Sequence, residues 1–397
     1  MTEEGALSGL VVLDLTRVLA GPFCTMMLAD MGATVIKIEQ PGIGDDTRGF
    51  YPFNEKGIST YYLNLNRNKK GITLDLKKGK QVFLDLVRKA DVVIENYRPG
   101  TMEKLGLGYE ELAKINPRLV YGEVSGYGAT GPYALRPGYD ILAQAMGGMM
   151  SLTGWPDRPP TACCGSIGDI LGGLSVCIGI LAALQNVHRT GKGQKVDVAL
   201  TDSVFASTVI TSQIYLTEGR IPTRIGNRYE NNYPYDTFTT ADGTVALAAG
   251  NNKLWKLCCD VIGHPECGDD ERYNSIGKRA KAHDEVRKLI EEWSTKHPTS
   301  EVVEQFVAVG VPCAPIQNIA QVVADPHIAG ARQMVVEVDD PVAGPTKMTG
   351  CHIKLSATPP SVRTPAPTLG RDNAEIFGDF LGYDKAKLEQ MTQEHMI

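Results

Sequence analysis

Short apolar segments alternate with amphipathic segments along the first half of the chain. The segments rich in β-branched and aliphatic residues, which predict strands, are residues 10–15, 35–38, 72–76, 92–96 and 119–124. Helical patterns lie between them, at residues 22–31 and 78–89. Strands that alternate with helices are typical of parallel sheets built from crossover connections, so we expect a doubly wound α/β domain.

Residues 159–188 form an apolar stretch with a single formally charged residue, Asp169. A helix is predicted at residues 170–188, followed by a glycine-containing turn and a further strand at residues 194–200. A carboxylate at the N-terminal end of a buried helix is either stabilised by hydrogen bonds or takes part in a reaction. Taken alone, this feature favours Asp169 as the N-cap of the helix that follows.

The second half of the chain differs from the first in composition and in its predicted elements. Residues 217–236, rich in Pro, Asn and Tyr, predict a linker, and residues 245–249 predict a strand. Amphipathic helices are predicted at residues 253–262, 282–296 and 300–309, which together indicate a smaller α+β domain over residues 237–326. Six prolines between positions 341 and 367 indicate another extended connection, and residues 373–391 predict two short terminal helices.

Composition narrows the functional class. The chain has 397 residues, 43% of them hydrophobic, and a formal net charge of −6, which fits about two folded domains. An acidic balance with interspersed cations gives no basic field for nucleic acid, so a small-molecule partner is expected. The N-terminus lacks signal-peptide character and no glycine-free apolar run reaches membrane-spanning length, so we expect a cytoplasmic protein without membrane contact.

The spacing of the cysteines and histidines does not indicate a metal or redox site. The nine cysteines form no CxxC motif, and the seven histidines form no HExxH motif. We therefore expect reduced packing thiols and no metal site.

The matches to nucleotide-binding and esterase motifs are also incomplete. Residues 126–131 fit GxGxxG, but Pro132 and Pro137 interrupt the helix that would receive a pyrophosphate. No GxxxxGK[ST] occurs, and Ser125 stands one place too late for a nucleophile elbow. Dinucleotide binding, nucleotide hydrolysis and serine esterase chemistry therefore lose support.

Cationic turns follow several predicted strands. Residues 16–22 end in a proline suited to the first position of a helix, so their N–H groups and Arg17 suit a phosphate, although an ordinary turn explains them equally well. Residues 96–100 follow another strand, with Lys104 about one turn beyond. Lys69, Lys70 and Lys77 flank a short strand. Together these cations suit a polyphosphate, but singly each is predicted to be a surface residue.

At this point the chain resembles the class III coenzyme A transferases, also called the CaiB/BaiF family, over nearly its whole length. The matching segments are residues 13–22, 35–39, 44–49, 68–77, 95–100, 125–128, 138–140, 168–169 and 190–194.

The resemblance implies that the protein moves coenzyme A from an acyl-CoA donor to a carboxylic acid, with Asp169 as catalytic aspartate. It also implies that the coenzyme A site is lined by Arg17, Val18, Leu19, Ala20, Gln40, Leu74, Lys77, Asn96, Tyr97, Arg98, Lys104 and Tyr139. No metal or permanently bound cofactor is implied, since coenzyme A is itself a substrate.

The resemblance further implies a homodimer of two interlocked, ring-like chains. Each chain would have a large Rossmann-like domain over residues 1–216, completed by residues 327–397, and a small domain after the linker. The two proline-rich connections suit such a ring.

The alternatives are a 2-methylacyl-CoA racemase of the same family and a non-catalytic acyl-CoA binding protein. The racemase branch pairs its Asp with a His that normally precedes the Asp corresponding to Asp140. Tyr139 occupies that place here, and a neutral Tyr is a poor base at pH 7, so transfer is preferred. Leu19 stands where formyl-CoA transferases carry Gln, and their run of glycines is missing near residues 227–233. These departures argue against formyl and oxalyl transfer and favour a larger acid.

Overall fold

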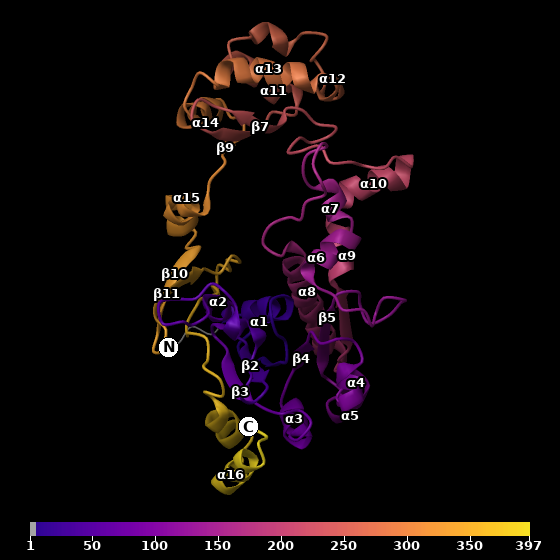
Figure 1. Cartoon of the computed structure of the whole chain (residues 1–397), viewed down its shortest axis with the longest axis vertical. Helices are drawn as coiled ribbons and strands as arrows, with labels where there is room; N and C mark the ends of the chain where they lie inside the picture. The colour runs from indigo at the N-terminus through magenta and orange to yellow at the C-terminus, as the bar shows by residue number, and fades with distance from the viewer. Residues whose placement is uncertain (1–4) are drawn as a thin grey trace. The chain divides into compact units, whose positions relative to one another are not determined.

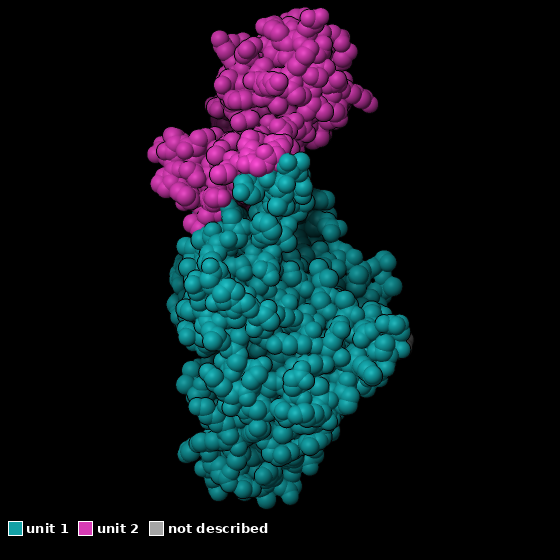
Figure 2. Space-filling view, turned by 90° about the vertical axis from the view of Figure 1, so that its right-hand side faces the viewer, with its two compact units in different colours: residues 1–149, 162–217, 325–397 teal, residues 150–161, 218–324 magenta. Residues whose placement is uncertain are grey.

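A computed structural model of the chain describes residues 5–397 (Figure 1). It divides into two compact units, coloured separately in Figure 2. Of the described residues, the first contains residues 5–149, 162–217 and 325–397, and the second contains residues 150–161 and 218–324. Residues 150–161 thus belong to the second unit, although the sequence places them in the large domain. The functional division into domains stays a prediction.

The first unit is built on a six-stranded parallel sheet. Its strands are β1 (Val11–Asp14), β2 (Thr34–Glu39), β3 (Lys70–Thr73), β4 (Val92–Glu95), β5 (Val120–Ser125) and β6 (Lys195–Ala199). The strand order is β3-β2-β1-β4-β5-β6, and every neighbouring pair is parallel. The predicted parallel α/β sheet is therefore confirmed, in the strand order of a Rossmann fold.

Helices cover both faces of this sheet. The helices of the first unit are α1 (Ala20–Asp30), α2 (Thr60–Asn66), α3 (Lys80–Val87), α4 (Thr101–Leu105), α5 (Tyr109–Ile115), α6 (Asp140–Met146), α8 (Ile167–Thr190), α9 (Leu200–Ser207) and α16 (Lys385–Gln393), with the short helices η1 (Asp46–Gly49), η3 (Pro326–Ala331) and η4 (Ala374–Phe380). Side chains alternate along β1: Val12 packs in the core with α1 and α8, and Leu13 packs with α3 and η4. Two hydrophobic cores thus lie on opposite faces of one sheet.

Helix α8 is the long apolar helix that the sequence predicts, and it begins earlier than expected, at Ile167. Glycines allow it to pack closely: a Cβ on Gly172 would lie 2.4 Å from Leu200, and one on Gly173 would lie 2.6 Å from the carbonyl oxygen of Ala20. Its length and composition would suffice to cross a membrane. Because α8 packs against α1, β5, β6 and α9, the same apolar character is explained by a core position.

The second unit is smaller and richer in helix. Its antiparallel sheet contains β7 (Tyr235–Thr239), β8 (Thr244–Ala248) and β9 (Cys313–Pro315), and its helices are α11 (Asn252–Val261), η2 (Pro265–Gly268), α12 (Ile276–Lys281), α13 (His283–Ser294), α14 (Thr299–Ala308) and α15 (Ile319–Ala324). Helices α7 (Met149–Leu152) and α10 (Val209–Glu218) each contain a boundary between the units. Fully buried Arg279 donates to the carbonyl oxygens of Tyr233, Gly250 and Tyr273, which ties the linker to the helices.

The proline-rich return segment contains more structure than its composition predicts. It forms an antiparallel hairpin of β10 (Val335–Asp340) and β11 (Gly344–Thr349) before the terminal helices. Ile376 and Phe377 of η4 then enter the core beside α3. The C-terminal residues therefore complete the first unit.

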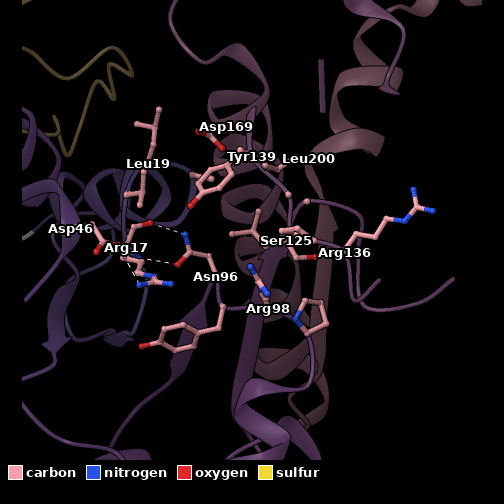
Figure 3. A pocket seen from close by; sticks show the side chains of 18 residues that line it. Arg17, Leu19, Asp46, Asn96, Arg98, Ser125, Arg136, Tyr139, Asp169 and Leu200 are labelled. Carbon is pink, nitrogen blue, oxygen red and sulfur yellow. Dashed lines mark hydrogen bonds and ion pairs between the residues drawn. The ribbon is translucent and has the colours of Figure 1, made fainter. Parts of the chain in front are cut away.

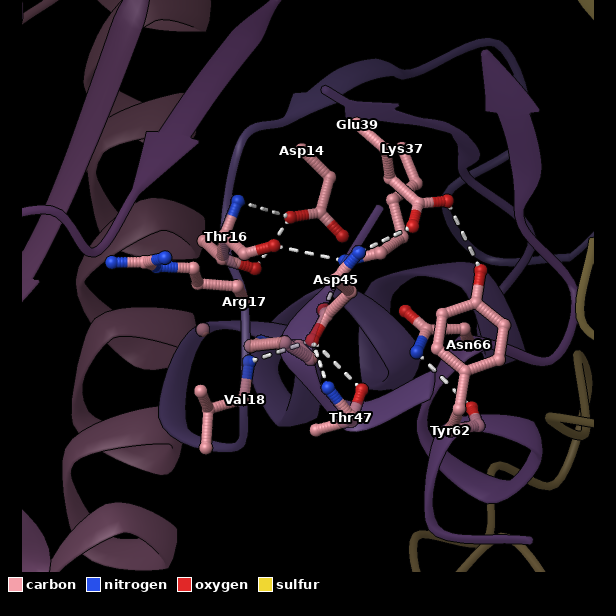
Figure 4. A network of polar contacts seen from close by, with 12 residues as sticks. Asp14, Thr16, Arg17, Val18, Lys37, Glu39, Asp45, Thr47, Tyr62 and Asn66 are labelled. Carbon is pink, nitrogen blue, oxygen red and sulfur yellow. Dashed lines mark hydrogen bonds and ion pairs between the residues drawn. The ribbon is translucent and has the colours of Figure 1, made fainter. Parts of the chain in front are cut away.

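A network of buried charges lies under the carboxyl end of β1 (Figure 4). The Nζ atom of Lys69 lies 3.0 Å from Asp14 Oδ2, and both side chains are inaccessible to solvent. Lys69 also donates to Asn66 Oδ1 at 2.9 Å. Lys69 is therefore not the surface residue that the sequence predicts. The cost of burying its charge is offset by a carboxylate and an amide oxygen.

Replacement of Lys69 by Met should destabilise the protein by about 3–5 kcal/mol, because it leaves the Asp14 carboxylate buried without its lysine partner. The neighbouring Lys70 forms an exposed ion pair with Glu375, so Lys70→Met should cost less than about 1 kcal/mol. Thermal and urea unfolding of the two variants provide the measurement. Equal losses of stability in both would contradict this account.

Candidate active site

A cavity opens at the carboxyl ends of β1, β4 and β5 (Figure 3). This is where the order of the strands reverses in a Rossmann-type sheet, so the loops after β1 and β4 diverge and leave room for a ligand. The lining residues are Arg17, Val18, Leu19, Ala20, Asp46, Asn96, Tyr97, Arg98, Pro99, Val124, Ser125, Gly126, Arg136, Pro137, Gly138, Tyr139, Asp169 and Leu200.

A buried ion pair stabilises the turn after β1. Lys37 Nζ lies 2.8 Å from Asp45 Oδ2 and also donates to the carbonyl oxygen of Thr16 at 2.8 Å. The other oxygen of Asp45 accepts from the backbone N–H of Val18 at 3.3 Å. Val18 has a φ of 67°, a conformation that a β-branched residue adopts only under constraint. The ion pair supplies that constraint, and it fixes the backbone that leads to Leu19 and Ala20.

Asn96 joins the turn after β4 to the turn after β1. Its Oδ1 atom accepts from the N–H of Arg17 at 2.9 Å, and its Nδ2 atom donates to the carbonyl oxygen of Arg17 at 2.7 Å. The amide of Asn96 is thus used to position Arg17. The guanidinium of Arg17 lies 3.2 Å from Asp46 and 5.9 Å from the centre of the Tyr97 ring, at the rim of the cavity.

A second cavity lies along the same edge of the sheet, and Tyr97 lines both. It contains three other residues that the resemblance assigns to coenzyme A, namely Gln40, Leu74 and Lys77. Burial and the nearby Glu95 raise the pKa of Tyr97 to about 12, so its hydroxyl is neutral at physiological pH. Lys104 is exposed on α4 and lines neither cavity, although Thr101 and Leu105 of the same helix line the second.

Asp169 lies in the first turn of α8 and lines the first cavity, together with Leu19 and Tyr139. Burial raises its pKa to about 7, and the neighbouring carboxylate of Asp140 contributes in the same direction. Burial, with a contribution from the charge of Asp169, also raises the pKa of Tyr61 on α2 to about 12. Desolvation makes a carboxylate more nucleophilic, so this side chain is suited to attack an electrophilic carbon.

Asp169 is not the N-cap that its position in the sequence favours. Helix α8 has Ser166 at its N-cap, and the side chain that accepts from the first turn is Asp140. The Oδ1 atom of Asp140 lies 2.7 Å from the N–H nitrogen of Gly168 and 3.3 Å from that of Asp169. The N–H of Gly168 is therefore occupied by Asp140, whereas Gly138 lines the cavity.

Two glycines bring Tyr139 and Asp140 to the end of β5. A Cβ on Gly126 would lie 2.5 Å from the Cα of Gly138, and a Cβ on Gly138 would lie 2.4 Å from the Cα of Gly126. Two backbones can approach this closely only when both residues lack a side chain. The GxGxxG match at Gly126 therefore has a packing role, and a loop follows it where a dinucleotide-binding fold would have a helix.

The structure brings together nine of the residues singled out in the sequence. They are Arg17, Val18, Leu19, Ala20, Asn96, Tyr97, Arg98, Tyr139 and Asp169. Sequence reasoning missed Asp46 and Arg136, which also line the cavity, and the side chain of Arg136 points away from the other labelled residues (Figure 3). Asp46 belongs to a segment that matches the family, and this match could have identified it as a site residue. Arg136 lies in none of the matching segments.

Comparison with known proteins identifies the family of the chain. The model of CoA-transferase family III matches residues 7–373. The chain belongs to CoA-transferase family III. The predicted family and the predicted class of enzyme are therefore confirmed.

Relatives and a solved structure match along most of the chain. The acetyl-CoA:oxalate CoA-transferase of Acetobacter aceti is 41% identical, over 95% of this chain and 96% of its own. The succinyl-CoA:mesaconate CoA-transferase of Haloarcula hispanica is also 41% identical, over 94% of this chain and 96% of its own. A crystal structure of a CaiB/BaiF family protein from Brucella suis superposes with a TM-score of 0.82 at 37% identity, covering 95% of this chain and 99% of that one.

Replacement of Gly126 by Ala should lower the rate of CoA transfer about tenfold or more, because the new methyl group must displace Gly138 and with it Tyr139. Initial rates and the melting temperature measure the effect. Gly277 in α12 has a negative φ and open space at its Cβ position, so Gly277→Ala is the matched control and should keep wild-type activity. Wild-type activity in Gly126→Ala would show that the close approach does not matter.

Proposed function

We propose that Asp169 is the nucleophile of this CoA-transferase. The observation that carries the proposal is its position: it is a desolvated carboxylate with a pKa of about 7 in a cavity between the turns after β1 and β4. A half-buried carboxylate that forms no ion pair with any described residue, and that is open to a ligand cavity, is placed for covalent chemistry. A cap would not require the cavity, and in this chain Asp140 accepts the N–H groups of the first turn.

The chemistry follows from the properties of a carboxylate. An oxygen of Asp169 attacks the thioester carbon of the donor, the C–S bond breaks, and a mixed anhydride and the coenzyme A thiolate result. The thiolate then attacks the aspartyl carbonyl carbon, which releases the donor acid and forms an aspartyl-CoA thioester. The acceptor carboxylate attacks this thioester, which expels the thiolate and forms a second mixed anhydride. The thiolate then attacks the acceptor carbonyl carbon of that anhydride, which forms acceptor acyl-CoA and releases the Asp169 carboxylate. Atoms balance without a redox or metal step.

The two cavities suggest how coenzyme A lies on the protein. We place the nucleotide end in the second cavity, beside Gln40, Leu74 and Lys77, and the thioester in the first, near Asp169. Tyr97 supports this placement because it lines both cavities. Lys104 remains a candidate for the phosphates, since its long side chain is exposed on the helix that borders the second cavity.

The acceptor is proposed to be a small dicarboxylic acid. Two relatives at 41% identity carry names with dicarboxylate acceptors, oxalate and mesaconate. The oxalate relative weakens the argument from Leu19 against oxalate transfer. Leu19 still gives the cavity an apolar side chain beside Asp169, which favours an acceptor with a carbon chain between its carboxylates.

We also propose that the enzyme is a cytoplasmic homodimer of interlocked chains, as the family resemblance implies. The β10–β11 hairpin and the C-terminal helices belong to the first unit although they follow the second in sequence, which is the chain order that a ring-like chain requires.

Replacement of Asp169 by Asn should reduce CoA transfer by ~10³-fold or more, because an amide oxygen is too weak a nucleophile to form the anhydride. The rates are measured with succinyl-CoA or acetyl-CoA against a panel of mono- and dicarboxylic acids, with the products identified by mass spectrometry. Hydroxylamine should label Asp169 in the wild type in the presence of donor. Exposed Asp202, in the first turn of α9, is the control, and Asp202→Asn should remain active.

Turnover by Asp169→Asn at the wild-type rate would refute the nucleophile and require CoA transfer to proceed through another group. The absence of transfer to any dicarboxylate, with transfer to monocarboxylic acids intact, would refute only the acceptor class.

The rate of transfer should depend on pH with an acid limb near pH 7. The pKa of Asp169 is raised to about 7, and only the deprotonated form attacks, so activity is present above this pH and lost as the pH falls. We expect kcat/KM to fall about tenfold per pH unit below the limb, since one proton is involved. A limb near pH 4, the value of an ordinary carboxyl group, would contradict the environment described for Asp169.

A further inference from the structure

Helix α6 caps the helix that carries Asp169. The Oδ1 atom of Asp140, at the first position of α6, accepts from the backbone N–H groups of Gly168 and Asp169. These are two of the four N–H groups at the start of α8 that have no partner within the helix. A Cβ on Gly168 would lie 2.9 Å from Asp140 Oδ1, so the contact depends on a glycine at this position.

The second oxygen of Asp140 connects α6 to the chain on the other side of the turn formed by residues 165–166. Gln144, one helical turn further along α6 and 1% exposed, donates from Nε2 to Asp140 Oδ2 at 2.7 Å. Its Oε1 atom accepts from the backbone N–H of Cys163 at 2.8 Å. Asp140 and Gln144 therefore hold the chain both before and after residues 165–166.

That turn has a backbone in need of external support. Gly165 and Ser166 both have positive φ values, 80° and 50°, and the side chain of Ser166 makes no capping hydrogen bond. A non-glycine residue in the left-handed region is held there by its surroundings at a cost in free energy. The turn precedes Asp169 directly, so any relaxation of it would displace the carboxylate.

Titratable groups near Asp169 include residues of two other helices, and Tyr139, directly before α6, lines the same cavity. Asp140 on α6 brings a second carboxylate, and Tyr61 on α2 brings a neutral hydroxyl. Asp140 is thus able to orient Asp169 through hydrogen bonds and to oppose its ionisation through its charge.

We propose that Asp140 is a positioning residue for Asp169, and that Gln144 acts through Asp140 by fixing its second oxygen. The inference rests on the proposed role of Asp169 as the nucleophile. Asp140 does not react with substrate. It determines where the nucleophile lies and at which pH it is charged.

Three variants test this proposal. Asp140→Ala removes both the hydrogen bonds and the charge, and should lower kcat about 10- to 100-fold with a much smaller change in KM for the donor, since only the reacting group is displaced. Asp140→Asn keeps an oxygen for Gly168 but turns an amide donor toward Gln144 Nε2, so its kcat above pH 8 should fall no further than that of Gln144→Leu. The loss of charge should move its acid limb down by about 0.5–1 pH unit. Gln144→Leu should show an intermediate loss of kcat.

The controls separate this proposal from its premise. Asp202→Asn removes an exposed acid at the start of another helix and should leave both kcat and the acid limb unchanged. A wild-type kcat in Asp140→Ala, or an unmoved acid limb in Asp140→Asn, would overturn the proposal while an inactive Asp169→Asn still supports the nucleophile. Melting temperatures identify loss of folding, and if Asp140→Ala does not fold, the pH profile of Asp140→Asn decides.

Discussion

The buried ion pair between Lys37 and Asp45 is the interaction on which the cavity depends. Neither charge reaches water, and such a pair is tolerated only when the remaining donors and acceptors are also satisfied. Here the carbonyl oxygen of Thr16 accepts from Lys37, and Asp45 accepts from Thr47 and from the N–H of Val18, so the pair and the turn after β1 constrain each other. The strained backbone of Val18, and with it the placement of Leu19, follows from this requirement.

Two aspartates show how the same side chain is directed to opposite roles. Lys69 and Lys37, together with hydroxyl donors, outweigh the effect of burial on Asp14 and lower its pKa to about 2, which keeps it charged as a structural anchor. Asp169 is half-buried, but the charge that acts on it is the carboxylate of Asp140, and its pKa is raised to about 7. The first arrangement stabilises a carboxylate and the second leaves one reactive.

Strand positions were predictable because burial on both faces gives parallel strands a continuous apolar pattern. Strands β1, β2, β4 and β5 agree with the expected segments to within one residue at each end, and the long helix α8 was expected from residue 170. Helices α2, α6 and α9 were not predicted. Helix α6, with Asp140 at its start, is the most consequential omission, because its seven residues give too little periodicity to detect.

The sequence by itself determined the alternation of strands and helices, the family, and the isolation of Asp169 within an apolar stretch. These properties are local, or they are carried by motifs in order along the chain. Only the tertiary structure decided that Lys69 is buried against Asp14, that Asn96 holds Arg17, and that Asp140 caps the helix of Asp169. Each of these contacts joins residues at least 28 positions apart. A buried polar group needs a hydrogen-bond partner, but the pattern of polar and apolar residues does not indicate which distant side chain provides it.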